Sequence, residues 1–142
     1  MCGLAGVWRS RNPIGERDLS DLARMTEAIA YRGPDDRSSW SDGRLALGHR
    51  RLSIIDPSPA AREPMLTPCG RGVLVYNGEV YNYRSLREDL RAEGIAFQTA
   101  SDAEVVLHAL HRWGPEKAIP LFDGMFSLAY FDARDGALWL AL

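Results

Sequence analysis

The sequence has few cysteines, few histidines and no strong charge of either sign. Only two of its 142 residues are cysteine, Cys2 and Cys69, and three are histidine. Two cysteines are too few for a disulfide framework, which favours a reducing, cytoplasmic location. The formal net charge of −2 provides no basic surface for nucleic acid. We therefore expect a protein without a nucleic-acid partner.

Long apolar segments are also missing. No apolar run approaches the ~20 residues that a membrane helix needs, and the N-terminus lacks the pattern of a secretory signal. The content of 46% hydrophobic and 25% charged residues is ordinary for a globular domain. At this length we expect one domain over residues 1–142, without a membrane partner.

The sequence contains one arrangement of residues that resembles a metal site. His108 and His111 are three residues apart on a predicted helix, and Glu104 lies one turn before His108. Zinc sites combine several ligands at characteristic spacings, and no further cysteine or histidine cluster has such a spacing. Gly3 and Gly6 lack the following Lys-Ser/Thr of a phosphate-binding loop. We therefore expect no metal in this chain.

Hydrophobic spacing predicts strands that are mostly joined by hairpin turns. Two-residue turns are expected at Asp42-Gly43 and Asn77-Gly78, and a long proline-rich irregular segment at 57–68. The expected strands span 3–8, 38–41, 44–55, 72–76, 79–81, 95–99, 125–131 and 137–142. The expected helices span 18–30, 82–93 and 101–113, with Asp18, Asn82 and Ser101 as caps. Strands outnumber helices, which indicates an α+β fold of antiparallel sheet packed against helices.

The N-terminus, Met1 to Trp8, places a cysteine directly behind the initiator methionine. If Met1 is removed, Cys2 carries a thiol and a free α-amine, whose pKa of ~7.7–8.0 allows it to act as a base. An N-terminal nucleophile works in this way, because the chain end activates its own side chain. With Met1 attached, the Cys2 nitrogen is an amide and has no basic lone pair. The alternative is that Cys2 is a small core residue without chemistry.

Three further polar stretches lie at predicted strand ends and turns. Arg50 and Arg51 sit in a predicted strand; an arginine fork suits a carboxylate, and one of the two is expected to be solvated. Asn77-Gly78 offers the donor types of an oxyanion hole, or forms a plain hairpin turn. Asp102 opens a helix, where it either complements the helix dipole or binds a substrate ammonium.

Six stretches keep the order of a known family. They are Met1-Cys2-Gly3-Leu4-Ala5-Gly6, Arg32-Gly33-Pro34-Asp35, Arg51-Leu52-Ser53-Ile54-Ile55-Asp56, Tyr76-Asn77-Gly78-Glu79-Val80-Tyr81-Asn82-Tyr83, Ser101-Asp102-Ala103-Glu104-Val105 and Phe122-Asp123-Gly124-Met125-Phe126-Ser127. Together they resemble the glutaminase domain of class II glutamine amidotransferases, and the asparagine synthetase B-like branch fits best. The resemblance implies an Ntn-hydrolase fold, a sandwich of antiparallel β-sheets flanked by helices.

The resemblance also implies hydrolysis of L-glutamine to glutamate and ammonia. Cys2 would be the nucleophile, and Asn77 and Gly78 would form the oxyanion hole. Arg51 would hold the α-carboxylate of glutamine and Asp102 its α-ammonium group. The remaining residues expected to bind substrate are Glu79 and, through their backbone, Leu52, Ser53, Ile54 and Ile55.

The chain departs from the family pattern at three places. Ala103 stands where the family often has threonine, and Tyr31 where it often has histidine. After Ala141 the family usually continues with an Arg-Asp pair, whereas here Leu142 ends the chain. We therefore expect a truncated glutaminase domain, incomplete at its C-terminus, whose ATP-binding synthetase domain is absent.

The partners that the resemblance implies lie largely outside this chain. The domain itself would need no cofactor, and ATP and Mg would belong to the covalently linked synthetase domain. That domain would pass the ammonia to an activated acceptor, aspartate by default or a sugar or polysaccharide precursor. A homodimer is a possible assembly. The alternative is a non-catalytic remnant that binds glutamine or a partner without turnover.

Overall fold

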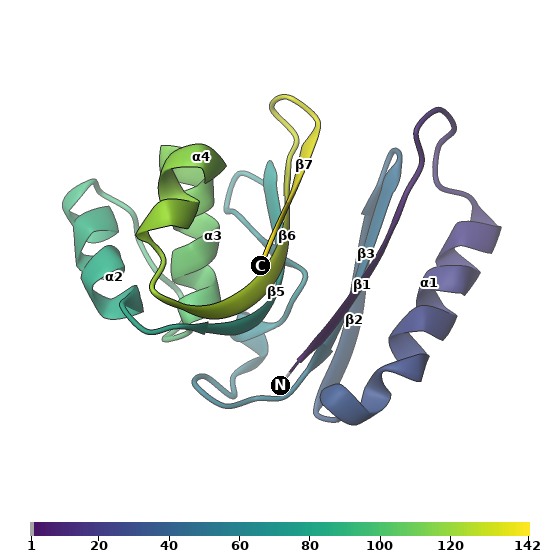
Figure 1. Cartoon of the computed structure of the whole chain (residues 1–142), viewed down its shortest axis with the longest axis horizontal. Helices are drawn as coiled ribbons and strands as arrows, with labels where there is room; N and C mark the ends of the chain where they lie inside the picture. Colours follow the sequence, from purple (N-terminus) through teal and green to yellow (C-terminus); the bar gives the residue numbers. More distant parts are fainter. Residues whose placement is uncertain (1) are drawn as a thin grey trace.

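The computed structural model of the protein describes residues 2–142. Figure 1 shows the order of its strands and helices along the chain. The strands are β1 (Gly3–Trp8), β2 (Asp36–Asp42), β3 (Leu45–Arg51), β4 (Met65–Leu66), β5 (Gly72–Val80), β6 (Gly124–Asp132) and β7 (Ala137–Ala141). The helices are α1 (Glu16–Ala28), α2 (Tyr83–Ala92), α3 (Asp102–Trp113) and the short α4 (Pro115–Ala118). Met1, and with it the expected release of the Cys2 amine, lies outside the described residues.

The strands form two antiparallel sheets that lie face to face (Figure 1). Sheet 1 has the strand order β1-β3-β2, and sheet 2 has the order β4-β5-β6-β7. Helix α1 packs on the outer face of sheet 1, while α3, with α2 beside it, packs on the outer face of sheet 2. The layers are therefore helix, sheet, sheet and helix, as the α+β sandwich prediction requires.

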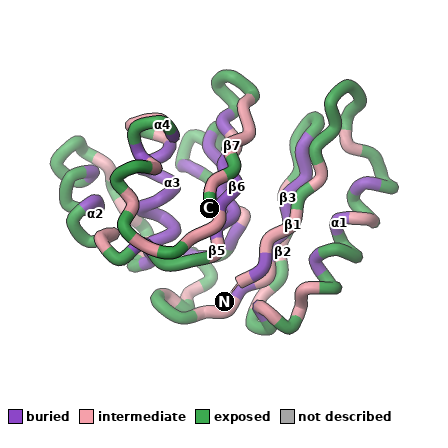
Figure 2. Tube along the Cα trace, in the orientation of Figure 1, coloured by how far each residue is buried: buried purple, intermediate pink, exposed green. Residues whose placement is uncertain are grey.

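Two apolar clusters fill the spaces between these layers, and Figure 2 shows the buried stretches along β5, β6 and α3. The cluster between the sheets contains Leu45, Leu47, Val73, Val75 and Ala129. The larger cluster, between sheet 2 and the helices, includes Leu74, Leu90, Val106, Leu110 and Tyr130. Successive side chains of a strand point to opposite faces, so β5 is buried on both sides. This strand is consequently a fixed base for any group attached to it.

Helix α1 begins two residues earlier than the hydrophobic spacing predicted. Its N-cap is Gly15, and Asp18 is the third helical residue rather than the cap. One oxygen of Asp18 accepts a hydrogen bond from the Gly15 N–H at 3.0 Å, and the other binds the guanidinium of Arg9. Asp18 thus caps the helix from inside the first turn, by reaching back to the N–H of the N-cap residue. The helices predicted at 82–93 and 101–113 and the final hairpin are confirmed.

The Asn77-Gly78 turn prediction is wrong. Strand β5 runs through both residues to Val80 and pairs them with Ser127 and Phe126 of β6. A Cβ atom on Gly78 would lie 2.3 Å from the carbonyl oxygen of Met125. The glycine is needed here because the backbone of β6 passes so close to it, and not because the chain reverses direction.

Two predicted strand segments are irregular in the structure. Strand β3 ends at Arg51, so residues 52–55 belong to a loop rather than to the strand. Residues 95–99 form no strand either, because the N–H groups of Gln98 and Thr99 donate to the carboxylate of Glu104 at 2.8 and 2.7 Å. A short strand that was not predicted, β4, interrupts the proline-rich segment and pairs with β5.

Candidate active site

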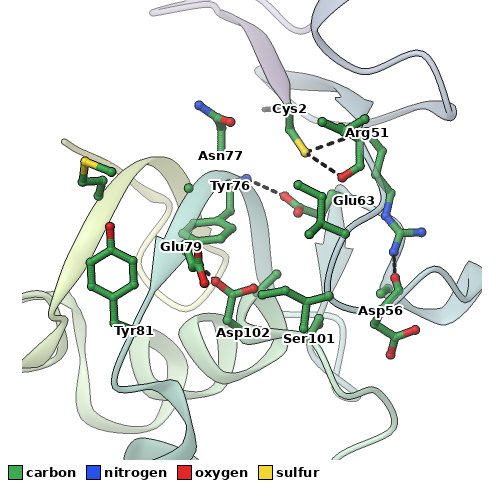
Figure 3. Close-up of a pocket in the computed structure, with 17 residues that line it drawn as sticks. Cys2, Arg51, Asp56, Glu63, Tyr76, Asn77, Glu79, Tyr81, Ser101 and Asp102 are labelled. Carbon is green, nitrogen blue, oxygen red and sulfur yellow. Dashed lines mark hydrogen bonds between the residues drawn. The ribbon is translucent and has the colours of Figure 1, made fainter.

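A pocket of about 210 Å³ opens beside the end of β3 (Figure 3). Its walls come from the start of β1, the loop after β3, strand β5 and the start of α3. Nine of the ten residues proposed from the sequence line it: Cys2, Arg51, Leu52, Ile54, Ile55, Asn77, Gly78, Glu79 and Asp102. Ser53 is not among the lining residues, and its backbone N–H donates to Asp35 at 2.7 Å. Residues that are far apart in sequence therefore meet around one cavity.

Cys2 lies directly before β1, next to the end of β3. The antiparallel register pairs Gly3 with Arg50, and Arg32 Nε donates to the Cys2 carbonyl at 2.9 Å. The Leu52 N–H donates to Cys2 Sγ at 3.3 Å. Burial raises the pKa of the Cys2 thiol, while the Leu52 hydrogen bond opposes this rise. The thiol is thus held in place but needs a base to lose its proton near neutral pH.

Arg51, the last residue of β3, holds the loop that forms one wall of the pocket. Its side chain is buried, with Nη1 donating to the Ser58 carbonyl at 2.9 Å and Nη2 donating to the Asp56 carbonyl. A guanidinium has five N–H donors, so these two bonds leave three for a ligand. The residue can therefore order the loop and still bind a carboxylate.

The neighbouring Arg50 points to the other face of sheet 1. Its Nε donates to the Thr26 carbonyl at 3.1 Å, and its Nη2 pairs with Glu27 of α1. Only 11% of the side chain is exposed, so the expectation that one of the two arginines is solvated is wrong. Helix α1 covers it instead, which leaves Arg51 as the arginine of the pocket.

Asp102, at the start of α3, is tied to β5. The side chain is 5% exposed, and its Oδ2 accepts hydrogen bonds from the Tyr76 hydroxyl at 2.8 Å and the Val80 N–H at 3.1 Å. Burial, and next the charge of Asp102, raise the pKa of Tyr76, so the phenol stays a donor. Ser101 is the N-cap, as predicted, and its Oγ accepts from the Glu104 N–H. The carboxylate consequently has a fixed position at the pocket wall.

Asn77 carries an amide without a bound partner at the pocket. Its Oδ1 is buried and has no hydrogen-bond partner within residues 2–142, and Figure 3 shows the side chain on the side of β5 nearer Cys2. An unsatisfied buried acceptor costs ~1–3 kcal/mol. Rotating the amide group by 180° exchanges the positions of Oδ1 and Nδ2. This rotation breaks no hydrogen bond of Oδ1, because Oδ1 has none within residues 2–142. The Asn77 amide is therefore free to present its N–H₂ group to a ligand.

Glu63 is a pocket residue that sequence reasoning missed. It is 5% exposed, accepts a hydrogen bond from the Tyr76 N–H, and lies 3.6 Å from His49 Nε2. Burial raises the pKa of Glu63 well above its usual value and lowers that of His49 to about 4. No spacing rule connects Glu63, in the proline-rich segment, with β5. Tyr76, by contrast, was part of a motif that already pointed to the site.

The mouth of the pocket has an apolar rim and a tethered loop. Ile54, Tyr81 and Met125 are 74%, 51% and 73% exposed, and all three line the pocket. Asp56 Oδ2 accepts a hydrogen bond from the Ala100 N–H at 2.8 Å. This bond connects the loop after β3 with the segment before α3, so the two walls are linked across the pocket.

The two histidines of α3 face different groups. His108 Nε2 faces Glu104 at 3.7 Å, whereas His111 Nε2 faces Cys69. The two rings thus have different neighbours. In the part of the chain that the structure describes, no group of three or more His, Cys, Asp or Glu side chains is arranged to hold a metal ion.

Residues 1–142 match the family model described as "Glutamine amidotransferase domain". The chain belongs to this family. Among its curated relatives is asparagine synthetase [glutamine-hydrolyzing] 3 of Bacillus subtilis (strain 168), 35% identical over 99% of this chain and 23% of that protein. Asparagine synthetase [glutamine-hydrolyzing] 1 of Arabidopsis thaliana is 32% identical over 99% of this chain and 23% of that protein. The amidotransferase domain thus spans about a quarter of the length of the relatives it matches.

A solved structure, that of the allosteric regulatory enzyme of purine biosynthesis, supports the fold of this amidotransferase domain. It matches with a TM-score of 0.51 and 22% identity, over 66% of this chain and 22% of that chain. At this identity the match concerns the fold alone. Together with the two antiparallel sheets flanked by helices, it confirms the predicted sandwich of antiparallel β-sheets between helices.

Proposed function

We propose that this domain hydrolyses L-glutamine to glutamate and ammonia, as the glutaminase part of a larger asparagine synthetase-like protein. The observation that carries the proposal is the set of side chains around one pocket: a thiol, a guanidinium, a buried carboxylate and an unbound amide. Free glutamine carries an α-carboxylate, an α-ammonium and a neutral side-chain amide. Arg51 matches the carboxylate and Asp102 the ammonium, which leaves the substrate amide for Cys2.

The chemistry begins with removal of Met1, which gives Cys2 a free α-amine. This amine takes the thiol proton, and Sγ attacks the side-chain carbonyl carbon of glutamine. The Asn77 amide and the Gly78 N–H donate to the oxygen that becomes negative. The C–N bond then breaks, the amine gives its proton to the leaving ammonia, and water hydrolyses the thioester to glutamate.

The loop residues and Glu79 supply the remaining contacts in this proposal. Glu79 is exposed at the pocket mouth, where its charge adds to that of Asp102 near the ammonium. Leu52 keeps the sulfur in place through its N–H. Of the loop segment 52–55, Ser53 contributes least, because its N–H is occupied by Asp35.

The acceptor half of the reaction belongs to the linked synthetase domain. The relatives' names, asparagine synthetase [glutamine-hydrolyzing], and the quarter of their length that this chain spans support such a domain. It would use ATP and Mg to activate the acceptor, aspartate by default, whereas the glutaminase part would need no cofactor. We further propose that the protein is cytoplasmic, with a homodimer as the candidate assembly. No helix within residues 2–142 is long and apolar enough to span a membrane.

Glutamate release from glutamine tests the proposal. The chain offers a matched pair of variants, because Cys2 and Cys69 are its only cysteines. With Met1 removed, as verified by intact mass, Cys2→Ala should abolish glutamate release and Cys69→Ala should retain it. Turnover by Cys2→Ala would overturn the assignment of the nucleophile. Binding of glutamine without turnover by the chain with a free Cys2 amine would favour the non-catalytic alternative.

A further inference from the structure

The second cysteine has a base beside it, far in sequence from Cys2. Cys69 lies in the turn between β4 and β5 and is exposed. Its Sγ is 3.5 Å from Nε2 of His111, which belongs to α3. Thr67 Oγ1 lies 3.4 Å from the same sulfur. A thiol within reach of an imidazole that a third group orients is the arrangement that activates nucleophiles.

The His111 ring is oriented by two residues of β6. Its Nδ1 lies 3.1 Å from the Tyr130 hydroxyl, which donates to Asp132 Oδ2 at 3.5 Å. When Tyr130 donates to Asp132, its oxygen accepts from Nδ1–H, and the bare Nε2 faces Cys69. Arg134 pairs with Asp132 and donates to the His111 carbonyl at 3.0 Å. The order of groups is therefore thiol, imidazole, phenol and carboxylate.

Gly72, the first residue of β5, provides the room for this cluster. A Cβ atom at this position would lie 2.9 Å from Thr67 Cγ2, 3.0 Å from the Tyr130 hydroxyl oxygen and 3.2 Å from His111 Nδ1. The Gly72 N–H also donates to Thr67 Oγ1 at 2.9 Å. Thr67, Tyr130 and His111 can therefore come this close to one another because residue 72 has no side chain.

Hydrogen bonds to the sulfur, more than the surrounding charges, favour the thiolate. The Thr67 hydrogen bond, and after it the Arg71 backbone, lower the pKa of Cys69. Burial and then the charge of Arg134 lower the pKa of His111, so its ring is neutral at pH 7 and able to accept a proton. The titratable and charged groups that act on the sulfur or the ring are Arg71 in the β4–β5 turn, His108 of α3, Asp132 of β6 and Arg134 in the β6–β7 turn.

We propose that Cys69 is a thiol-modification site that reacts with low-molecular-weight disulfides carrying carboxylates. His111 Nε2 takes the Cys69 proton, and Sγ attacks one sulfur of the disulfide. The new Sγ–S bond forms as the old S–S bond breaks, and the leaving thiolate takes up the proton. Cys69 is oxidised to a mixed disulfide, and the other half of the reagent is reduced to a thiol. The flanking Arg71 suits a reagent with negative charge.

The probe is 5,5′-dithiobis(2-nitrobenzoate), an aromatic disulfide with two carboxylates, which releases an acidic aryl thiol that stays ionised at pH 7 as a coloured thiolate. The whole chain is used with Cys2→Ala, so that Cys69 is the only thiol and glutaminase activity plays no part. For each unit by which a thiol's pKa falls, the thiolate fraction rises tenfold and its nucleophilicity falls by ~3-fold. Because the gain in thiolate exceeds the loss in nucleophilicity, we expect the folded chain to react faster at pH 7 than the same chain in denaturing urea. An equal or slower rate in the folded chain would overturn the proposal.

Two histidine variants of α3 separate a role of His111 from a general effect on the helix. His111→Gln should shift the inflection of the pH–rate profile upward, toward that of the unfolded chain. The matched control His108→Gln keeps an N–H₂ group toward Glu104 and should move the inflection much less, because His108 acts on His111 more weakly than Arg134 and Asp132 do. Circular dichroism shows whether His111→Gln is folded. If the folded variant has an unchanged pH–rate profile, His111 is not the base that activates Cys69. If His111→Gln fails to fold, the comparison of the folded with the unfolded parent protein still shows whether the fold makes Cys69 more reactive.

Discussion

The Tyr76 hydroxyl donates a hydrogen bond of 2.8 Å to Asp102 Oδ2, which joins the central strand of the pocket to the start of α3. Both residues are buried. Hydrogen bonds to charged groups contribute ~1.5–3 kcal/mol to stability. The carboxylate proposed to recognise the substrate ammonium is therefore positioned by a residue that would not itself touch the reacting atoms.

Removing this hydroxyl should weaken both stability and glutamine binding. Tyr76→Phe should lower the free energy of unfolding by ~1.5–3 kcal/mol, because Asp102 keeps only the Val80 N–H as donor to Oδ2. It should also raise KM for glutamine. Urea denaturation and steady-state glutamate release measure the two effects. Tyr31→Phe, at a residue that is 79% exposed, is the control, and an unchanged urea midpoint in Tyr76→Phe would contradict the argument.

Binding and chemistry should separate at the pocket. Asp102→Asn keeps an oxygen for Tyr76 but loses the charge, so it should mainly raise KM, as should Arg51→Ala. Asn77→Ala removes the proposed donor to the developing oxyanion and should lower kcat by ~10²–10³. Steady-state kinetics over a range of glutamine concentrations distinguishes the two patterns. A change confined to KM in Asn77→Ala would show that the amide binds the ground state.

Stability should fall on acidification because His49 is buried in its neutral form. Its pKa is about 4, below the ~6.5 of an unfolded histidine, so the unfolded chain binds more protons between these values. At ~1.4 kcal/mol per pKa unit, the neutral ring contributes about 3 kcal/mol above pH 6.5. This contribution is lost as the pH falls toward 4.

The variant His49→Gln isolates this effect from other titrating groups. Glu63 has a raised pKa and therefore acts in the opposite sense: its contribution to the stability of the folded chain is lost as the pH rises. Urea midpoints measured from pH 4 to 7 should fall less steeply on acidification in His49→Gln than in the parent chain. Parallel pH profiles would show that the ring is not the group responsible.

Gly33 should be intolerant of any side chain. A Cβ atom there would lie 2.3 Å from the Arg50 carbonyl carbon and 2.5 Å from the Arg51 nitrogen, so the end of β3 must move. Gly33→Ala should destabilise the fold by at least ~1–3 kcal/mol and raise KM by displacing Arg51. Gly15→Ala, where no atom lies within 4 Å of the added carbon, should cost under ~1 kcal/mol. Equal thermal midpoints for the two variants would refute the close approach.

The sequence predicts the layers and most of the pocket, and its errors have identifiable physical causes. Asn77-Gly78 fits a turn rule because glycine tolerates positive φ, yet the glycine is needed for the close backbone of β6. Residues 95–99 look like a strand, but the carboxylate of Glu104 satisfies their N–H groups. Glu63 could not be found, because its place depends on how the loop after β3 folds back onto Tyr76.

Sheet 1 uses only residues 3–51 and sheet 2 only residues 65–141, so a single crossing, 52–64, joins the two halves. That connector also contributes Leu52, Ile54 and Glu63 to the pocket wall. A break or insertion there would leave each sheet's own strand pairing intact while disturbing the wall that faces the ligand. Two separately produced halves could reassociate through the apolar face between the sheets. Ligand binding would then return only when the halves are joined, because the pocket needs both of them. The connector thus makes the domain a natural candidate for a split-protein sensor.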